Sequence, residues 1–215
     1  MDRLKYIKLT DPEWGCLIQD LLDTNPEFVP YIDIVPISRY PMGYGRNPGE
    51  PHVPHMPQNI FEHLIYYITE AGVNRNYAHK QWDIISTVLR KNNYDLTMIP
   101  KALIQPKKIQ TYLDLSEYLK LKDIRPENIT IEDIKNPAFK IKGIGIGAVA
   151  QLKLFYSSDN DIASFSDRGF IQGFMKIYAL KTKPTITQMK KTVEKWGYAQ
   201  RAGEAMCFQV FHYGL

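Results

Sequence analysis

Three glycines at alternate positions, Gly143, Gly145 and Gly147, form the part of the sequence with the clearest chemical potential. Glycines allow a tight turn without side chains, so its backbone N–H groups can approach a phosphate closely. The residues that follow predict a helix over 146–156, whose positive N-terminal end would strengthen the attraction. A turn of this kind binds the backbone of a nucleic acid without reading its sequence.

A carboxylate follows this turn. Asp167 comes twenty residues after Gly147, directly before a run that predicts a helix. Aspartate is a common N-cap residue, so capping alone would explain an acid at this position. A carboxylate beside a bound strand can also stabilise positive charge and orient an attacking water. The two roles are compatible with each other.

The elements that must position these residues are predicted to be helices, because apolar residues recur at intervals of three and four. Tripeptide 33–35 is the only weak strand candidate. We therefore expect an all-α fold of about ten helices, arranged as two lobes on either side of the hairpin with a cleft between them. The predicted helices cover residues 11–25, 58–72, 76–91, 107–121, 129–135, 146–156, 167–179, 185–195 and 199–212.

Residues 27–57 differ in composition from the rest of the chain. Their seven prolines and three glycines predict a long irregular segment. A loop of this length is typically functional, disordered or wrapped on the surface. We divide the chain into residues 1–57, a helix followed by this segment, and residues 58–215, a helical domain with the hairpin at about 137–156. The N-terminal helix is expected to pack with the C-terminal helices.

Composition restricts the function classes only in part. The net charge of +4 permits a polyanion as partner but does not require one. Cys16 and Cys207 are too few for a disulfide framework or a four-cysteine metal site, and the five histidines lack metal-ligand spacing. No apolar run has the length of a signal peptide or membrane span. We expect a monomer without metal, cofactor or membrane contact, located in the cytoplasm of a prokaryote or virus-infected cell, or in the nucleus.

Five segments follow one another in a distinctive order: NIFEHLIYYITEAGVNRNYAHKQW, KGIGIGAVA, DIASFSDRGF, IQGFMKIYAL and VEKWGYAQRAGEAMCFQVF. This order resembles the helix-hairpin-helix superfamily of DNA glycosylases over roughly residues 55–215, and the turn before the IQGF helix resembles the alkylation-repair branch. The resemblance implies that Asp167 is the catalytic aspartate, facing the sugar of a nucleotide turned out of duplex DNA. It also implies that the hairpin binds a DNA phosphate. The hairpin residues in this chain are Lys142, Gly143, Ile144, Gly145, Ile146 and Gly147.

Further roles follow from the same resemblance. Relatives that also cut the strand carry a lysine where this chain has Gly147, so the resemblance implies a monofunctional enzyme that uses water. The family's usual residue for filling the gap left by the extruded base is missing, and Asn74 or Arg75 is the candidate for that role. Independently of the resemblance, the glycines and arginines of residues 38–46 suit a loop that approaches a ligand or phosphates. The candidate contacts to the base or to phosphates are Arg39, Tyr40, Tyr44, Arg46 and Tyr67.

Three functions remain open from the sequence. The first is a DNA glycosylase that removes a damaged or modified base. The second is a transferase of the same fold, similar to viral relatives thought to replace an activated group on a thymine derivative in DNA with an amine. The third is a DNA-binding module that kept the hairpin and lost catalysis.

Overall fold

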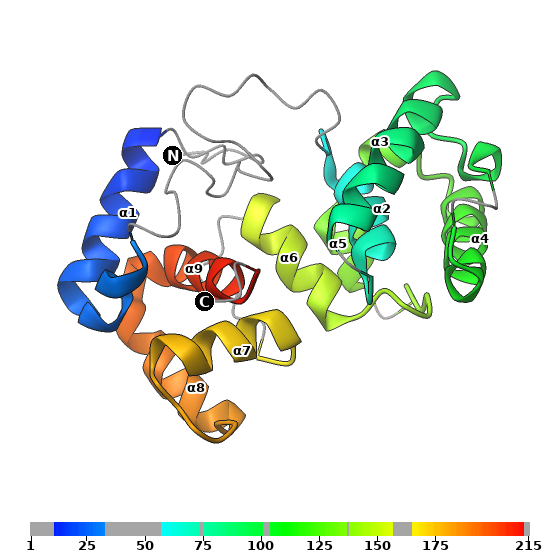
Figure 1. Cartoon of the computed structure of the whole chain (residues 1–215). Coiled ribbons are helices and arrows are strands. Elements are labelled where there is room, and N and C mark those ends of the chain that lie inside the picture. Colours follow the sequence, from blue (N-terminus) through cyan, green and yellow to red (C-terminus); the bar gives the residue numbers. More distant parts are fainter. Residues whose placement is uncertain are drawn as a thin grey trace. The chain divides into compact units, whose positions relative to one another are not determined.

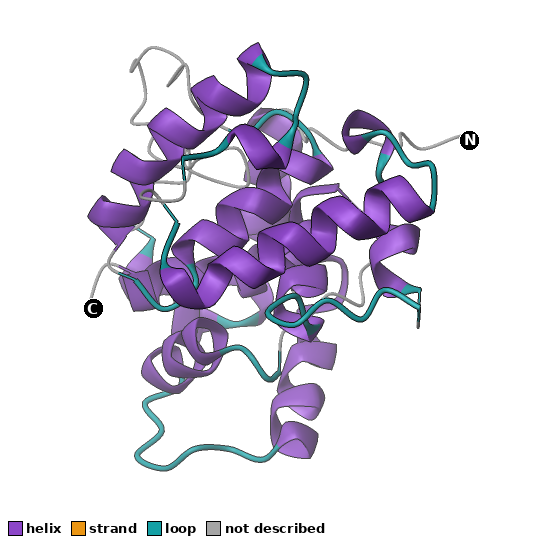
Figure 2. Ribbon diagram, turned by 90° about the vertical axis from the view of Figure 1, so that its right-hand side faces the viewer, coloured by secondary structure: helices purple, strands orange, loops and turns teal. Residues whose placement is uncertain are grey.

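The computed structural model describes residues 11–32, 57–73, 75–100, 104–136, 138–156 and 165–212. Within these ranges, the side chains of residues 11–14, 75, 76, 79, 155 and 212 are not described. All regular elements in the described ranges are helical (Figures 1 and 2), so the expected all-α class is confirmed. The strand candidate at residues 33–35 lies outside the described residues.

The described residues form nine α-helices, and every predicted helix has an observed counterpart whose ends differ by at most two residues. None of them is long and apolar enough to cross a membrane. The helices are α1 (Asp11–Thr24), α2 (Ile60–Glu70), α3 (Arg75–Lys91), α4 (Pro106–Leu121), α5 (Ile131–Lys135), α6 (Ile146–Tyr156), α7 (Arg168–Ile177), α8 (Ile186–Val193) and α9 (Gln200–His212). Short 3₁₀ helices are η1 (Pro26–Tyr31), η3 (Leu96–Met98), η5 (Pro126–Asn128) and η6 (Glu194–Ala199).

The chain forms two compact units, which we describe separately. Unit 1 comprises residues 1–53 and 153–215, and unit 2 comprises residues 54–152. Helix α6 begins in unit 2 and its last turn belongs to unit 1. The division expected at residues 57 and 58, and the cleft expected between two lobes, stay predictions.

Unit 1 has an aromatic core between α1, α7, η6 and α9. The ring of Trp196 lies edge-on to that of Phe28, with centroids 5.5 Å apart, and its indole N–H donates a 2.8 Å hydrogen bond to Tyr178. Helix α7 packs most extensively against α9, and α1 also packs against α9 and η6. Burying each large side chain in such a core stabilises the fold by about 1.5–3 kcal/mol. The rigid framework that carries Asp167 is therefore the α7–α9 pair.

Unit 2 is organised by α2, one face of which is buried against α3 and α4. At the start of α2, the fully buried carboxylate of Glu62 receives two hydrogen bonds from Arg90 in α3, 2.9 Å from Nε and 2.7 Å from Nη2. The Tyr94 hydroxyl and the Gln58 backbone N–H donate to the same carboxylate. Four donors satisfy this buried charge, so Glu62 fixes the start of α2 against the end of α3.

Candidate functional site

The glycine hairpin is a defined turn in unit 2 between α5 and α6. Gly143 has a φ of +94°, a conformation that residues with a Cβ rarely adopt. The Thr111 hydroxyl of α4 donates a 2.8 Å hydrogen bond to the carbonyl of Lys142, and a Cβ at Gly143 would lie 3.0 Å from the Thr111 Oγ1 atom. Ile144 is buried, and its N–H donates to the carbonyl of Ile141. The turn is therefore held from two sides.

Beyond this anchored part, the hairpin presents unobstructed backbone. Gly145 is exposed, and a Cβ placed on it would meet no atom within 4 Å. Helix α6 begins at Ile146, whose side chain is 76% exposed. Within the described part of the chain, the N–H groups of Gly145, Ile146 and Gly147 donate to no backbone carbonyl. Free N–H groups at the positive end of a helix form a site suited to an anion.

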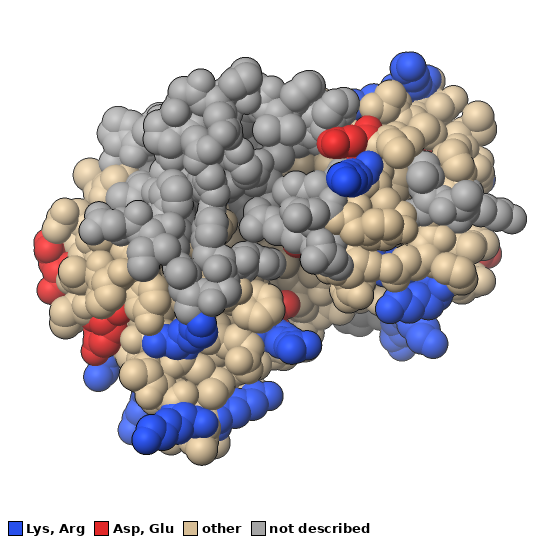
Figure 3. Space-filling model, in the orientation of Figure 1, with Lys and Arg blue, Asp and Glu red and all other residues tan. Residues whose placement is uncertain are grey.

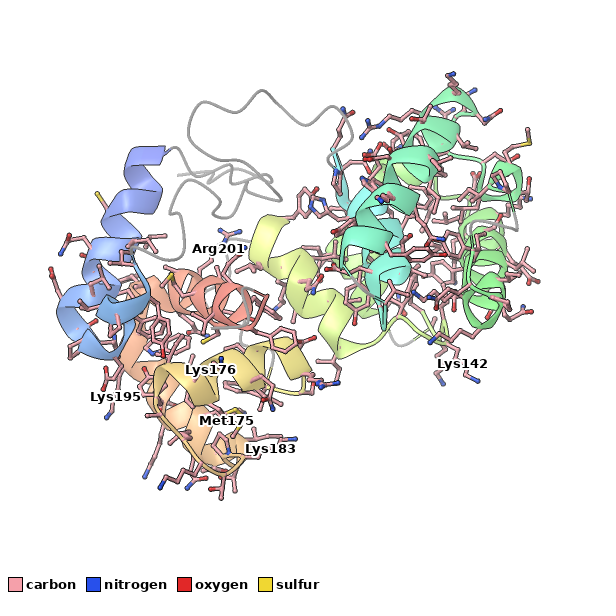
Figure 4. The ribbon with its side chains drawn as sticks, in the orientation of Figure 1. Lys142, Met175, Lys176, Lys183, Lys195 and Arg201 are labelled. Atoms are coloured by element: carbon pink, nitrogen blue, oxygen red, sulfur yellow. The ribbon has the colours of Figure 1, made fainter. Side chains whose placement is uncertain are left out.

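Four lysines belong to the segments that form or contact this turn, but not all of them are exposed to a ligand. Lys140 and Lys142 are exposed, and Figure 4 shows Lys142 pointing away from the helices of unit 2. Lys107 is exposed and lies one helical turn before Thr111 on α4. Lys108 is different, because it is only 8% exposed and donates a 2.8 Å hydrogen bond to the carbonyl of Thr69 near the end of α2. Burial lowers the pKa of Lys108 to about 8, and its role is structural.

Asp167 is the N-cap of α7 in unit 1. Its Oδ1 atom accepts hydrogen bonds from the N–H groups of Gly169 and Phe170, at 2.7 and 3.2 Å. The side chain is half-buried, and among the described residues nothing donates to Oδ2. The capping role considered from the sequence is therefore real, and it occupies only one of the two carboxylate oxygens. In the part of the chain that the structure describes, the second oxygen has no hydrogen-bond donor, so it can accept from a ligand or a water.

Aromatic side chains surround the capped turn, and the sequence had not singled them out. A Cβ at Gly169 would lie 3.1 Å from the Asp167 Oδ1 atom and 3.2 Å from the rings of Phe208 and Phe211, so α9 closes tightly on this end of α7. The Phe165 ring packs edge-on against that of Phe170, with centroids 5.9 Å apart. These contacts give Asp167 a rigid apolar support. The Gly169–Gly173 spacing on the helix was the sequence signal that could have indicated it.

The C-terminal end of α6 is hydrogen-bonded by a charged residue that the sequence analysis did not identify. Arg201 of α9 is buried, and its guanidinium donates to the carbonyl of Leu154 in the last turn of α6. Burial lowers the pKa of Arg201 to about 10, an effect that the nearby carboxylate of Glu204 opposes. Glu204 is itself fully buried. This arrangement is structural, since it satisfies carbonyls at a helix C-terminus.

The other candidate residues are described only in part. Tyr67 is half-buried on α2, and Arg75 is the first residue of α3, with its side chain outside the description. Asn74, Arg39, Tyr40, Tyr44 and Arg46 lie outside the described residues. The structure thus brings together the six hairpin residues in unit 2, while Asp167 belongs to unit 1.

A cavity of about 300 Å³ lies in unit 2, at the ends of α3 and α4. Tyr94, Asp95, Lys120, Asp123 and Arg125 are among its lining residues, and it includes none of the candidate site residues. In the described ranges, no group of three or more His, Cys, Asp or Glu side chains could hold a metal ion. Asp167 and the hairpin therefore remain the residues with the strongest chemical case.

The chain was also compared with known proteins. No model of a protein family matches it. The curated proteins likewise give no match.

Proposed function

We propose that this chain binds duplex DNA and hydrolyses the N-glycosidic bond of an extruded damaged or modified base. The observation that carries the proposal is the arrangement of Asp167, whose Oδ1 atom caps α7 while Oδ2 has no donor among the described residues. A carboxylate fixed in this way keeps its negative charge in one place. Such preorganised charge stabilises positive charge that develops in a transition state.

The reaction needs only this carboxylate and a water molecule. As the bond between C1′ and the base nitrogen breaks, its electron pair leaves with the base and positive charge develops on the sugar. Asp167 stabilises that charge and orients a water, whose oxygen bonds to C1′. The proton lost by the water passes to the carboxylate or to solvent, and the departing base gains a proton from solvent. The resemblance to the glycosylase family aligns Gly147 with the lysine of the strand-cutting relatives, so no covalent enzyme–DNA intermediate is expected.

The hairpin supplies DNA binding in this proposal. Its free N–H groups at Gly145, Ile146 and Gly147 suit a phosphate, and Lys142 adds a positive charge beside them. Backbone contacts of this kind position the duplex and carry no sequence information. Recognition of the base would therefore come from other residues.

The experiment that tests the proposed function is mass spectrometry of the products formed from duplexes that each carry one damaged or modified base. We expect one substrate to yield the free base and an abasic strand, and no adduct to be trapped by borohydride. An abasic product together with a trapped adduct would replace the water mechanism with amine catalysis. Exchange of a group on the base for an amine, without an abasic site, would assign the transferase. The absence of turnover on any duplex, with DNA binding intact, would leave a binding module.

Gly145→Leu provides a separate test of the hairpin. We expect the dissociation constant for duplex DNA to rise at least about tenfold, equal to about 1.4 kcal/mol, and equally for different sequences. The physical reason is that the new side chain would cover the N–H groups that face the phosphate. Because a Cβ at Gly145 meets no atom within 4 Å, the melting temperature should change little. Fluorescence anisotropy and thermal unfolding would measure the two effects.

Gly143→Ala is the matched control for that prediction. At φ +94°, and with Thr111 Oγ1 only 3.0 Å from the new Cβ, this substitution should destabilise unit 2 by about 1 kcal/mol or more. The Gly145 variant thus tests DNA binding, whereas the Gly143 variant tests the stability of the fold. A Gly145 variant with unchanged affinity, or with a loss confined to one DNA sequence, would contradict the backbone-binding role.

A further inference from the structure

Positive charge is concentrated in one segment of unit 1, away from the hairpin in the sequence. Residues 168–195 contain seven basic residues and one acidic residue, a net charge of +6, whereas the whole chain carries +4. All other residues together therefore carry a net charge of −2. Segregation of this kind is not needed for solubility, which depends on the total charge. It is the electrostatic pattern expected of a polyanion-binding face.

Six exposed lysines form this face, which we call the lysine surface. They come from the end of α7, the turn between α7 and α8, helix α8 and the start of η6. Figure 3 shows basic side chains gathered over this part of unit 1, and Figure 4 labels three of them. The six residues are Lys176, Lys181, Lys183, Lys190, Lys191 and Lys195.

Among the described residues, no acidic side chain forms an ion pair with the lysine surface. The ion pairs Arg90–Glu62 and Lys135–Glu132 belong to unit 2. Glu194 is the one acidic residue in the segment, and it is exposed. The anchoring of α8 is apolar, through buried Met189 and Val193. Its lysines therefore keep their charge available to a partner.

The lysine surface adjoins the end of α7 that carries Asp167. The Lys190 ammonium lies 5.9 Å from the centroid of the Phe165 ring, close enough for a cation–π contact. Phe165 stands two residues before Asp167 and packs against Phe170 in the first turn of α7. All of these residues belong to unit 1, so this proximity does not depend on the placement of unit 2.

We propose that the lysine surface is a second binding site for the phosphate backbone of DNA, separate from the hairpin. It contacts the strand that flanks the nucleotide facing Asp167, and in that respect it rests on the proposed function. Exposed lysines contact phosphates as point charges and give no base specificity. The surface therefore contributes affinity, strong salt dependence and retention of the DNA at Asp167.

The test compares two variants of the full chain that lose the same charge. The first replaces Lys183, Lys190, Lys191 and Lys195 with glutamine. The second replaces four exposed lysines of unit 2, Lys80, Lys91, Lys120 and Lys122. Binding of an undamaged duplex is measured over a series of salt concentrations. For the first variant, we expect a dissociation constant about a hundredfold higher at moderate salt. The slope of the logarithm of the association constant against log[salt] should be smaller in magnitude by about 3.

The control variant should change affinity by less than about threefold, because loss of net charge alone acts weakly at moderate salt. Equal losses in the two variants would mean that only total charge matters, and would overturn the proposal. An unchanged salt slope in the first variant would do the same. So would lysine-dependent binding to phosphatidylserine vesicles without any effect on DNA.

Binding to undamaged DNA does not require catalysis, so this result and the proposed function can fail independently. If the first variant binds DNA more weakly but the parent protein releases no base, the lysine surface is supported and the enzymatic assignment is rejected. If the parent protein releases base and the first variant binds DNA as tightly as the parent, the enzymatic assignment is supported and the lysine surface is rejected.

Discussion

Asp167→Asn is expected to reduce base release by about a thousandfold, equal to about 4 kcal/mol of transition-state stabilisation. The amide has nearly the shape of the carboxylate but lacks the charge that opposes the developing positive charge on the sugar. Asparagine is also a good N-cap, and its Oδ1 atom can accept the same hydrogen bonds from Gly169 and Phe170. Single-turnover kinetics on the substrate found by mass spectrometry would measure the loss.

Two further variants separate the charge from the cap. Asp167→Ser keeps a capping oxygen without the charge, so it should be as inactive as the asparagine variant and nearly as stable as the parent. Asp167→Ala removes both, and should also lower the free energy of unfolding by about 1 kcal/mol. DNA affinity should be similar in all three, because the proposed phosphate contacts are made by other residues. If Asp167→Asn retains activity within about tenfold of the parent, Asp167 is a cap and nothing more.

The helices were predictable because the chain marks them with local signals. Asn59 caps α2 and Thr130 and Thr185 head capping boxes, so the ends of these helices are set by residues within one turn. The buried faces follow from apolar spacing, as with Phe61, Leu64 and Ile65. For the same local reason, Asp167 could be considered as an N-cap from the sequence alone.

Burial of charged residues was not predictable in this way. Lys107 and Lys108 are neighbours in the chain, yet Lys107 is exposed whereas Lys108 is buried and donates a hydrogen bond to the carbonyl of Thr69, near the end of another helix. Glu62 and Arg201 are buried for similar reasons. Their partners lie 28 and 47 residues away in the chain, so no local pattern reveals them.

The hairpin falls between these two cases. Its glycines indicated a turn with accessible N–H groups, but not which glycine serves folding and which leaves room for a ligand. That distinction depends on Thr111, a residue of α4 that closes on Gly143 and leaves Gly145 open. The aromatic support of Asp167 likewise depends on residues distant in the sequence, because Phe208 and Phe211 belong to α9.

Gly173→Ala is expected to be the most damaging single substitution for stability. A Cβ at Gly173 would lie 1.7 Å from the carbonyl oxygen of Cys207 and 2.5 Å from its carbonyl carbon. These are backbone atoms of α9 and cannot rotate away, so α7 and α9 would have to separate. We expect a loss of at least about 4 kcal/mol, a large part of the 5–15 kcal/mol that stabilises a typical domain. Thermal unfolding should show a melting temperature lower by about 8–16 °C.

Gly15→Ala in α1 is the matched control, since a Cβ there meets no atom within 4 Å. Alanine is the better helix former, so this variant should be more stable by about 0.5–1 kcal/mol. The same chemical change is thus expected to have opposite signs at the two positions. A Gly173 variant that melts within about 2 °C of the parent would show that α7 and α9 are not held at this distance.

The stability of this contact also bears on the candidate site. Gly169 and Gly173 lie on one face of α7, one turn apart, and both are needed for close approach to α9. Because Asp167 directly precedes this helix, separation of α7 from α9 would move the carboxylate away from Phe208 and Phe211. A Gly173 variant that still folds should therefore lose base release even though Asp167 is present. Retained base release in such a destabilised variant would show that the acid does not need the α9 support.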